Sequence, residues 1–158
     1  MARSLLTALI IAFLPAAAAH AQLMPDSDEP IDISGDAAEF QDNVTIWTGN
    51  VRLVQAEAIL TAQRLEATLN DDGDFETMTA TGTVRFSNGN EAITGERAFY
   101  EEKTRTITIS ENVIVKQGKQ VMSAGAVVYW VDSGRVKFIP APGKRIRGIF
   151  YTEESGQT

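Results

Sequence analysis

The sequence predicts an all-β protein, and three observations support this fold class. Short runs of alternating β-branched and aromatic residues recur between residues 30 and 151, as in Val44-Thr45-Ile46. Gly, Asn and Asp bound these runs, and Asp72-Gly73 and Asn88-Gly89 are typical of type I′ hairpin turns. Two short elements also repeat along the chain, at a spacing of about thirty residues.

The first repeated element is a polar turn followed by a strand. Thr48-Gly49-Asn50-Val51-Arg52-Leu53 recurs as Thr81-Gly82-Thr83-Val84-Arg85-Phe86, and more loosely as Ser110-Glu111-Asn112-Val113-Ile114-Val115. A unit of about thirty residues cannot bury its apolar face alone, so neighbouring units must stack into one continuous core.

The second repeated element is an aliphatic residue, then Ser or Thr, then Gly or Ala, followed by a pair of apolar residues at i and i+2. The four copies begin at Ile33-Ser34-Gly35, Leu60-Thr61-Ala62, Ile93-Thr94-Gly95 and Met122-Ser123-Ala124. We expect the small residue to mark a bend or bulge in a curved sheet. The repeat also predicts that Ala56–Leu69 is a strand, although its propensity alone would allow a helix.

The amino-terminal residues are expected to be a cleavable signal peptide, residues 1–21. Arg3 supplies a positive charge, and the apolar run from Leu5 to Leu14 is short for a membrane span. Ala19-His20-Ala21 fits the A-x-A rule, which places cleavage after Ala21. An uncleaved anchor helix is the alternative interpretation.

The remaining chain divides into three parts by composition. Residues 22–29 are acidic and without pattern, and we expect a flexible leader. Residues 30–151 carry the β pattern and form the single predicted domain. Residues 152–158 are polar and are predicted to be a disordered tail.

Composition narrows the classes of function. The formal net charge is −7, which disfavours nucleic acid and anionic lipid surfaces as partners. The chain has no Cys, and its single His, His20, lies in the predicted signal peptide. A mature chain without either residue has no Ser-His-Asp or Cys-His nucleophile and no ordinary zinc site. We therefore expect no catalytic residues, no metal and no cofactor.

Two acidic segments were considered as sites. Asn70-Asp71-Asp72-Gly73-Asp74 resembles a calcium loop but lacks the spacing and the downstream Glu of such loops, so we interpret it as a polar hairpin turn. Glu101-Glu102 is interpreted as a surface turn, because no apolar pocket is evident that would raise a carboxyl pKa.

The order and spacing of the repeats, together with the signal peptide, resemble the OstA-like family of periplasmic lipopolysaccharide-transport proteins. The resemblance spans residues 30–151. It is carried by Pro30-Ile31-Asp32-Ile33, Thr48-Gly49-Asn50-Val51, the apolar pairs of the second element and Gly143-Lys144-Arg145-Ile146. It implies an incomplete, twisted antiparallel β-jellyroll built from the repeated strand pairs, open at both ends, with an apolar interior along its axis.

The resemblance also implies a function and partners. The function is a periplasmic carrier or bridge that binds the lipid A acyl chains of lipopolysaccharide and moves it from the inner to the outer membrane. The implied partners are an inner-membrane-anchored transport protein of the same fold, an outer-membrane assembly protein and further copies in a head-to-tail homo-oligomer. Exposing an acyl chain of about a dozen carbons to water costs on the order of 10 kcal/mol, so such a carrier needs a dry groove.

Candidate lipid-binding residues are those that alternation places on the inward face. Each could instead belong to ordinary core packing. They are Phe40, Val44, Ile46, Val51, Leu53, Leu65, Val84, Phe86, Tyr100, Ile107, Ile109, Val113, Val115, Val127, Tyr129 and Phe138. Lys144, Arg145 and Arg147 are candidates for contact with lipid A phosphates at a groove mouth, or else a solvated cluster that discourages edge aggregation.

Two other functions remain open at this stage. The chain could be a periplasmic scaffold between membrane assembly complexes that holds no lipid. It could also be a polysaccharide hydrolase, which would need two carboxylates about 5 to 9.5 Å apart in a cleft.

Overall fold

The computed structural model describes residue 27 and residues 29–151, and within them it contains ten β-strands in one sheet and no helix. The strands are β1 (Asp32–Ser34), β2 (Ala37–Gln41), β3 (Val44–Gln55), β4 (Ala58–Leu69), β5 (Phe75–Ser87), β6 (Glu91–Glu101), β7 (Thr106–Gln117), β8 (Gln120–Trp130), β9 (Arg135–Ile139) and β10 (Arg147–Ile149). The all-β prediction is confirmed, and β4 is the strand expected from the repeats.

The predicted signal peptide, its cleavage site after Ala21, most of the leader and the tail lie outside the described residues. No helix of the described part is long and apolar enough to span a bilayer.

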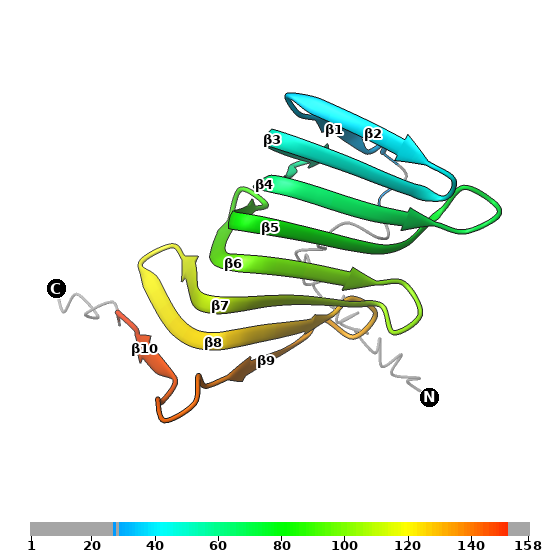
Figure 1. Cartoon of the computed structure of the whole chain (residues 1–158). Helices are drawn as coiled ribbons and strands as arrows, with labels where there is room; N and C mark the ends of the chain where they lie inside the picture. Colours follow the sequence, from blue (N-terminus) through cyan, green and yellow to red (C-terminus); the bar gives the residue numbers. More distant parts are fainter. Residues whose placement is uncertain (1–26, 28, 152–158) are drawn as a thin grey trace, which may run out of the picture.

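The sheet is an antiparallel meander with two open edges. Strands β3 to β8 pair in sequence order, β1 and β2 both pair with β3, and β9 and β10 both pair with β8 (Figure 1). Because neither edge pairs with the other, the sheet does not close into a barrel. The prediction of an incomplete jellyroll open at both ends is confirmed.

Every long strand bends sharply near its middle, and the bends fall on one line across the sheet, here called the corner line. In β3, β5 and β7 the corner is a pair of consecutive residues with positive φ: Gly49 and Asn50, Gly82 and Thr83, and Glu111 and Asn112. The strand register is interrupted at each pair. The Thr-Gly-Asn repeat is therefore a corner inside a strand, and the left-handed conformation explains its Gly and Asn residues.

The neighbouring strands place small residues at the same line, as the second repeat predicted. Gly95 of β6 has no space for a side chain, because an added Cβ would lie 2.7 Å from Cγ2 of Ile109. The alternation of inward residues also changes phase here. On β4 the buried positions are Leu60 and Ala62 before the corner, then Leu65 and Ala67 after it.

The corner line divides the sheet into two arms that face each other at an angle. Arm 1 contains β2, β9 and residues 44–48, 64–69, 75–81, 97–101, 106–110 and 126–130; arm 2 contains β1, β10 and residues 51–55, 58–62, 84–87, 91–95, 113–117 and 120–124. Figure 1 shows the bend clearly in β7 and β8. The inner faces of the two arms form the protein's core.

The hairpin turns differ in detail from the prediction. Gly73 and Gly89 have φ values of 88° and 87°, but Asp72 and Asn88 do not have positive φ. The predicted type I′ turns are therefore wrong, since that turn needs positive φ at both central residues. Side-chain capping replaces it: Asn70 Oδ1 accepts hydrogen bonds from the backbone N–H groups of Asp72 and Asp74, at 3.0 and 2.9 Å.

A glycine substitution at the corner line should destabilise the fold more than one in a loop. Gly82 and Gly118 both have positive φ, but an added Cβ at Gly82 would lie 2.7 Å from Cβ of Gln63, while nothing lies within 4 Å at Gly118. Each change to Ala carries the left-handed backbone cost of about 1–2 kcal/mol. We expect Gly82→Ala to lower the free energy of unfolding by about 1–3 kcal/mol more than Gly118→Ala, because of this overpacking. Urea denaturation measures both, and equal losses would contradict the corner.

Candidate ligand-binding groove

The space between the arms is filled where β3, β4 and β5 lie side by side. Val51, Leu53, Leu65, Val84 and Phe86 are each no more than 2% exposed. The remaining gap in this region is only about 30 Å³, a tenth of the cavity described next. This half of the interior is packed like an ordinary protein core.

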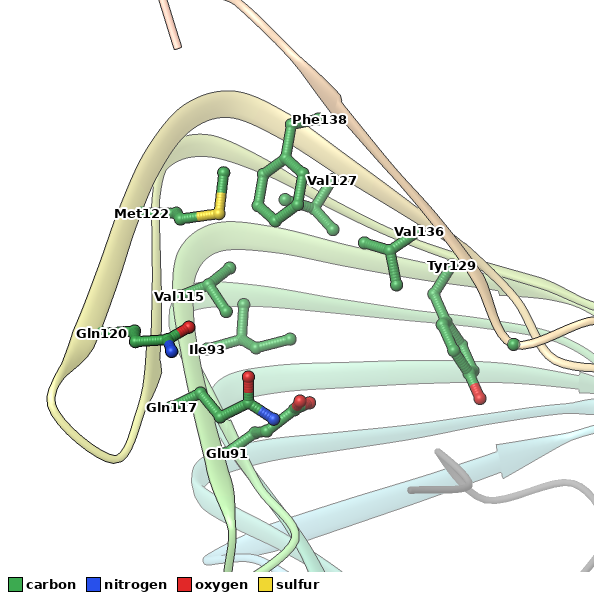
Figure 2. A pocket seen from close by; sticks show the side chains of 11 residues that line it. Glu91, Ile93, Val115, Gln117, Gln120, Met122, Val127, Tyr129, Val136 and Phe138 are labelled. Atoms are coloured by element: carbon green, nitrogen blue, oxygen red, sulfur yellow. The ribbon is translucent and has the colours of Figure 1, made fainter. Parts of the chain in front are cut away.

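The arms enclose an open cavity where β6, β7, β8 and β9 lie side by side. Its volume is about 300 Å³, at the lower end of the range for small-molecule sites. Figure 2 shows Ile93, Val115 and Met122 on arm 2 facing Val136 and Tyr129 on arm 1 across this space. Phe138 and Val127 lie beside Met122, near the corner. We call this space the groove cavity.

The described lining of the groove cavity is apolar except for the Tyr129 hydroxyl and the polar side chains at the tip of arm 2. Glu91, Gln117 and Gln120 lie there, close together in Figure 2. They follow one another across the strands, because Glu91 is the register partner of Gln117 and Gln117 is the partner of Gln120. An elongated apolar ligand in the cavity would therefore meet a polar rim at this side.

The slit between the arm tips is also hollow beside β4 and β5, but there it is polar and ionic. Gln55 and Ile31 lie on one side, and Tyr100, Glu102 and Arg105 on the other, around a space of about 320 Å³. The Arg105 guanidinium forms ion pairs with Glu102, at 3.3 Å, and with Asp132. The Tyr100 hydroxyl donates a hydrogen bond to Glu102. These links hold the turns at the tip of arm 1 together.

Most of the sequence-predicted lipid-binding residues lie on the inner face. The buried ones are Val51, Leu53, Leu65, Val84, Phe86, Tyr100, Ile107, Ile109, Val113, Val127 and Tyr129, and the half-buried ones are Val115 and Phe138. Of this set only Val115, Val127, Tyr129 and Phe138 line the groove cavity. Lipid contact at these four positions remains a prediction.

Three predicted inward residues are placed differently. Val44 and Ile46 lie on the outer face, because Thr45 and Trp47 are the register partners of the buried Ala67 and Leu65. Ile46 instead pairs with Glu66, whose carboxylate binds Arg64 at 2.7 Å on the outside.

Phe40 lies on the inner face, as predicted, but its side chain is exposed. It stacks edge-to-face on Trp47, with ring centroids 5.8 Å apart, yet is 69% exposed. The reason is its place on β2, an edge strand that pairs with β3 and with no other strand among the described residues.

Sequence reasoning missed the inner-face residues Trp47, Met122 and Val136. Trp47 could have been found only from the register with β4, since Ile46 is the better match to the β pattern. Met122 begins the fourth copy of the second repeat, which could have identified it, whereas Val136 lies beyond the repeats. The polar rim gave no sequence signal, because isolated glutamines near a turn are ordinary surface residues.

The predicted phosphate-binding residues do not border the groove cavity. Lys144 and Arg145 line a separate hollow of about 260 Å³, together with Asn112 and Ser123 at the corner line. Arg147 pairs with Ser123, whose neighbour Met122 faces inward, so Arg147 lies on the outer face. Lys144 and Arg145 belong to the loop between β9 and β10, and contact with a phosphate at these positions remains a prediction.

No group of three or more His, Cys, Asp or Glu side chains within residues 29–151 could hold a metal ion. The Asn70–Asp74 segment is the hairpin turn that was predicted, with its Asn side chain occupied by the loop's own backbone.

A single sheet that is folded along one line around an apolar interior, and that opens into a cavity near β9, defines an open β-groove protein. The chain belongs to the family described as "LptA/(LptD N-terminal domain) LPS transport protein", whose model matches residues 32–135. The chain is thus a member of a lipopolysaccharide-transport family.

A solved structure supports the fold. The chain is similar to LptH from Pseudomonas aeruginosa, described as "the LptA homologous periplasmic component of the conserved lipopolysaccharide transport device". The TM-score is 0.69 with 20% sequence identity, over 80% of this chain and 99% of LptH. No match was found among curated protein sequences.

Truncating side chains at the two ends of the interior should separate core from groove. Phe86 is 2% exposed, whereas Val136 is 47% exposed and lines the groove cavity. We expect Phe86→Ala to lower the free energy of unfolding by about 3–5 kcal/mol. Val136→Ala should lower it by less than about 1 kcal/mol. Chemical denaturation of the lipid-free protein measures both, and comparable losses would show that the cavity is packed as tightly as the core.

Proposed function

We propose that the chain is a periplasmic carrier and bridge that binds the acyl chains of lipopolysaccharide and moves the lipid from the inner to the outer membrane. The observation that carries the proposal is the groove cavity, an apolar space of about 300 Å³ that continues the inner face of the sheet towards its β9 edge. Membership of the transport family supports the identity of the lipid.

The physical requirement for such a carrier is a dry path. Each buried CH₂ group contributes about 0.8 kcal/mol, so an acyl chain of about a dozen carbons gains on the order of 10 kcal/mol by leaving water. Met122, Val136 and Phe138 supply the half-exposed apolar surface for this at the open end. The packed end, around Phe86, supplies rigidity instead.

We further propose that copies of the chain stack head to tail through their open edges. Both edges expose apolar inner-face residues that a neighbour would cover: Phe40 on β2 and Val136 on β9. Strands β2 and β9 run in opposite directions within one copy. If two copies stack with their arms aligned, β9 of one copy is therefore antiparallel to β2 of the next. Strand addition of this kind supplies main-chain hydrogen bonds.

The charges on the outer faces of the two edges are opposite. Asp32 and Glu39 are exposed on β1 and β2, whereas Arg135, Lys137 and Arg147 are exposed on β9 and β10. Stacking would bring β9 beside β2 and β10 beside β1, so unlike charges would meet. Lys144 and Arg145 add to the basic edge, where they would bind a phosphate away from the groove cavity.

The family supports two further partners for the same edges. These are an inner-membrane-anchored transport protein of the same fold and an outer-membrane assembly protein. The proposal includes no enzymatic activity and no cofactor. The alternative of a scaffold without lipid is disfavoured by the groove cavity, since a scaffold has no need of an unfilled apolar space.

Photocrosslinking should distinguish a lipid-lining face from a bare scaffold. A photoreactive residue at Met122 should crosslink to lipopolysaccharide in cells, because this side chain lines the groove cavity. The same residue at Lys137, on the outer face of the neighbouring β9, is the matched control and should crosslink to protein only. Lipid crosslinks confined to Lys137 would rule out the inner face as the binding surface.

Charge reversal should test edge pairing and its direction. The double variants Lys137→Glu/Arg147→Glu and Asp32→Lys/Glu39→Lys should each self-associate roughly tenfold more weakly than the parent chain at low salt, since each interface then meets like charges. Mixing the two variants should restore association, because the reversed edges match. Sedimentation velocity measures this. Unchanged self-association of both variants would contradict the proposed pairing.

A further inference from the structure

The polar rim of the groove cavity is a regular feature of the sheet. Glu91, Gln117 and Gln120 are direct register partners on β6, β7 and β8. Their inner-face neighbours one step towards the corner are Ile93, Val115 and Met122, which are all apolar. The polar side chains thus form one row along the tip of arm 2, parallel to the groove, with the apolar wall directly beside it (Figure 2).

Two further polar residues lie at the tip of arm 2, on the side of the sheet where β3 and β5 are packed. Asn88 and Gln55 stand there, 8% and 5% exposed, and each has a buried side-chain atom without a hydrogen-bond partner: Asn88 Nδ2 and Gln55 Oε1. A buried polar atom left unpaired costs about 1–3 kcal/mol. The other side-chain atom of each is used within the fold: Asn88 Oδ1 accepts hydrogen bonds from the backbone N–H groups of Asn90 and Glu91, and Gln55 Nε2 donates to the backbone carbonyls of Ser27 and Glu29. These bonds account for the two buried residues, and the row at the groove cavity consists of Glu91, Gln117 and Gln120.

The chemistry of the rim selects a type of ligand group. Carboxamides both donate and accept hydrogen bonds, and the Glu91 carboxylate accepts them. Within the described lining of the groove cavity Glu91 is the only charged side chain, so the rim offers a phosphate no cation. No hydrogen bond joins the side chains of Gln117 and Gln120 to any described residue, which leaves their amides available.

We propose that this row binds the uncharged polar groups of an acylated amino sugar, its hydroxyls and amide linkages, where the acyl chains enter the groove cavity. The rim then makes the groove selective for a multiply acylated glycolipid over a single fatty acid. This inference rests on the proposed lipid-binding function. It places phosphate groups away from the rim.

Two probes of matched chain length test the inference on the purified mature protein. One is a tetra-acylated glucosamine disaccharide without phosphate, and the other is the corresponding free fatty acid. Calorimetry or displacement of a fluorescent fatty acid gives both affinities. The Gln117→Met/Gln120→Met variant should bind the glycolipid about tenfold more weakly, for the loss of two hydrogen-bonding amides, and should bind the fatty acid as the parent does.

Gln41→Met is the matched control, because Gln41 is exposed on the outer face of β2. It should leave both affinities unchanged, and circular dichroism checks that each variant is folded. If the parent chain binds both probes and the double variant binds both equally well, the rim has no role and the inference fails. If neither probe binds the parent chain, the proposed function itself fails. Equal loss of both affinities would show a general change in the cavity and also overturn the inference.

Discussion

The corner line determines the shape of the molecule. An antiparallel sheet with one apolar face would ordinarily need a second layer to cover that face. Here consecutive positive-φ pairs in β3, β5 and β7, opposite small residues in the neighbouring strands, fold the sheet onto itself. One sheet therefore supplies both walls of its own interior. Because all the corners are aligned, the interior is a continuous groove that runs across the strands.

The groove is not uniform along its length. Around Leu53 and Phe86 the two arms interdigitate and leave almost no space, which gives the fold its stability. Towards β9 the arms leave a cavity of about 300 Å³, and the apolar face remains partly uncovered. The inward residues of the two halves are of the same chemical type. Their surroundings differ: Phe86 is 2% exposed, whereas Val136 on the edge strand β9 is 47% exposed.

This difference explains how far the sequence could predict the structure. The thirty-residue repeats identified the strand pairs and the bend at the small residues. Alternation assigned most inward residues correctly, but it failed at Ile46 and Val44, because Trp47 and Thr45 take the inner positions through the register with β4. The turn geometry at Asp72 and Asn88 was mistaken, since side-chain caps replaced positive φ. The separation of the arms, and with it the groove cavity, depends on contacts between strands distant in sequence and was not predictable from local patterns.

The opposite charges of the two sheet edges have a consequence for an assembly of any length. In the proposed stack each added copy would cover one acidic and one basic edge, and would present one of each again. A stack of two copies and a stack of ten would therefore end in the same pair of surfaces, with Glu39 at one terminus and Lys137 at the other. A membrane-bound domain that recognises one terminus would dock with the same polarity whatever the distance to be spanned. The polarity of the proposed stack would thus be a property of the single chain.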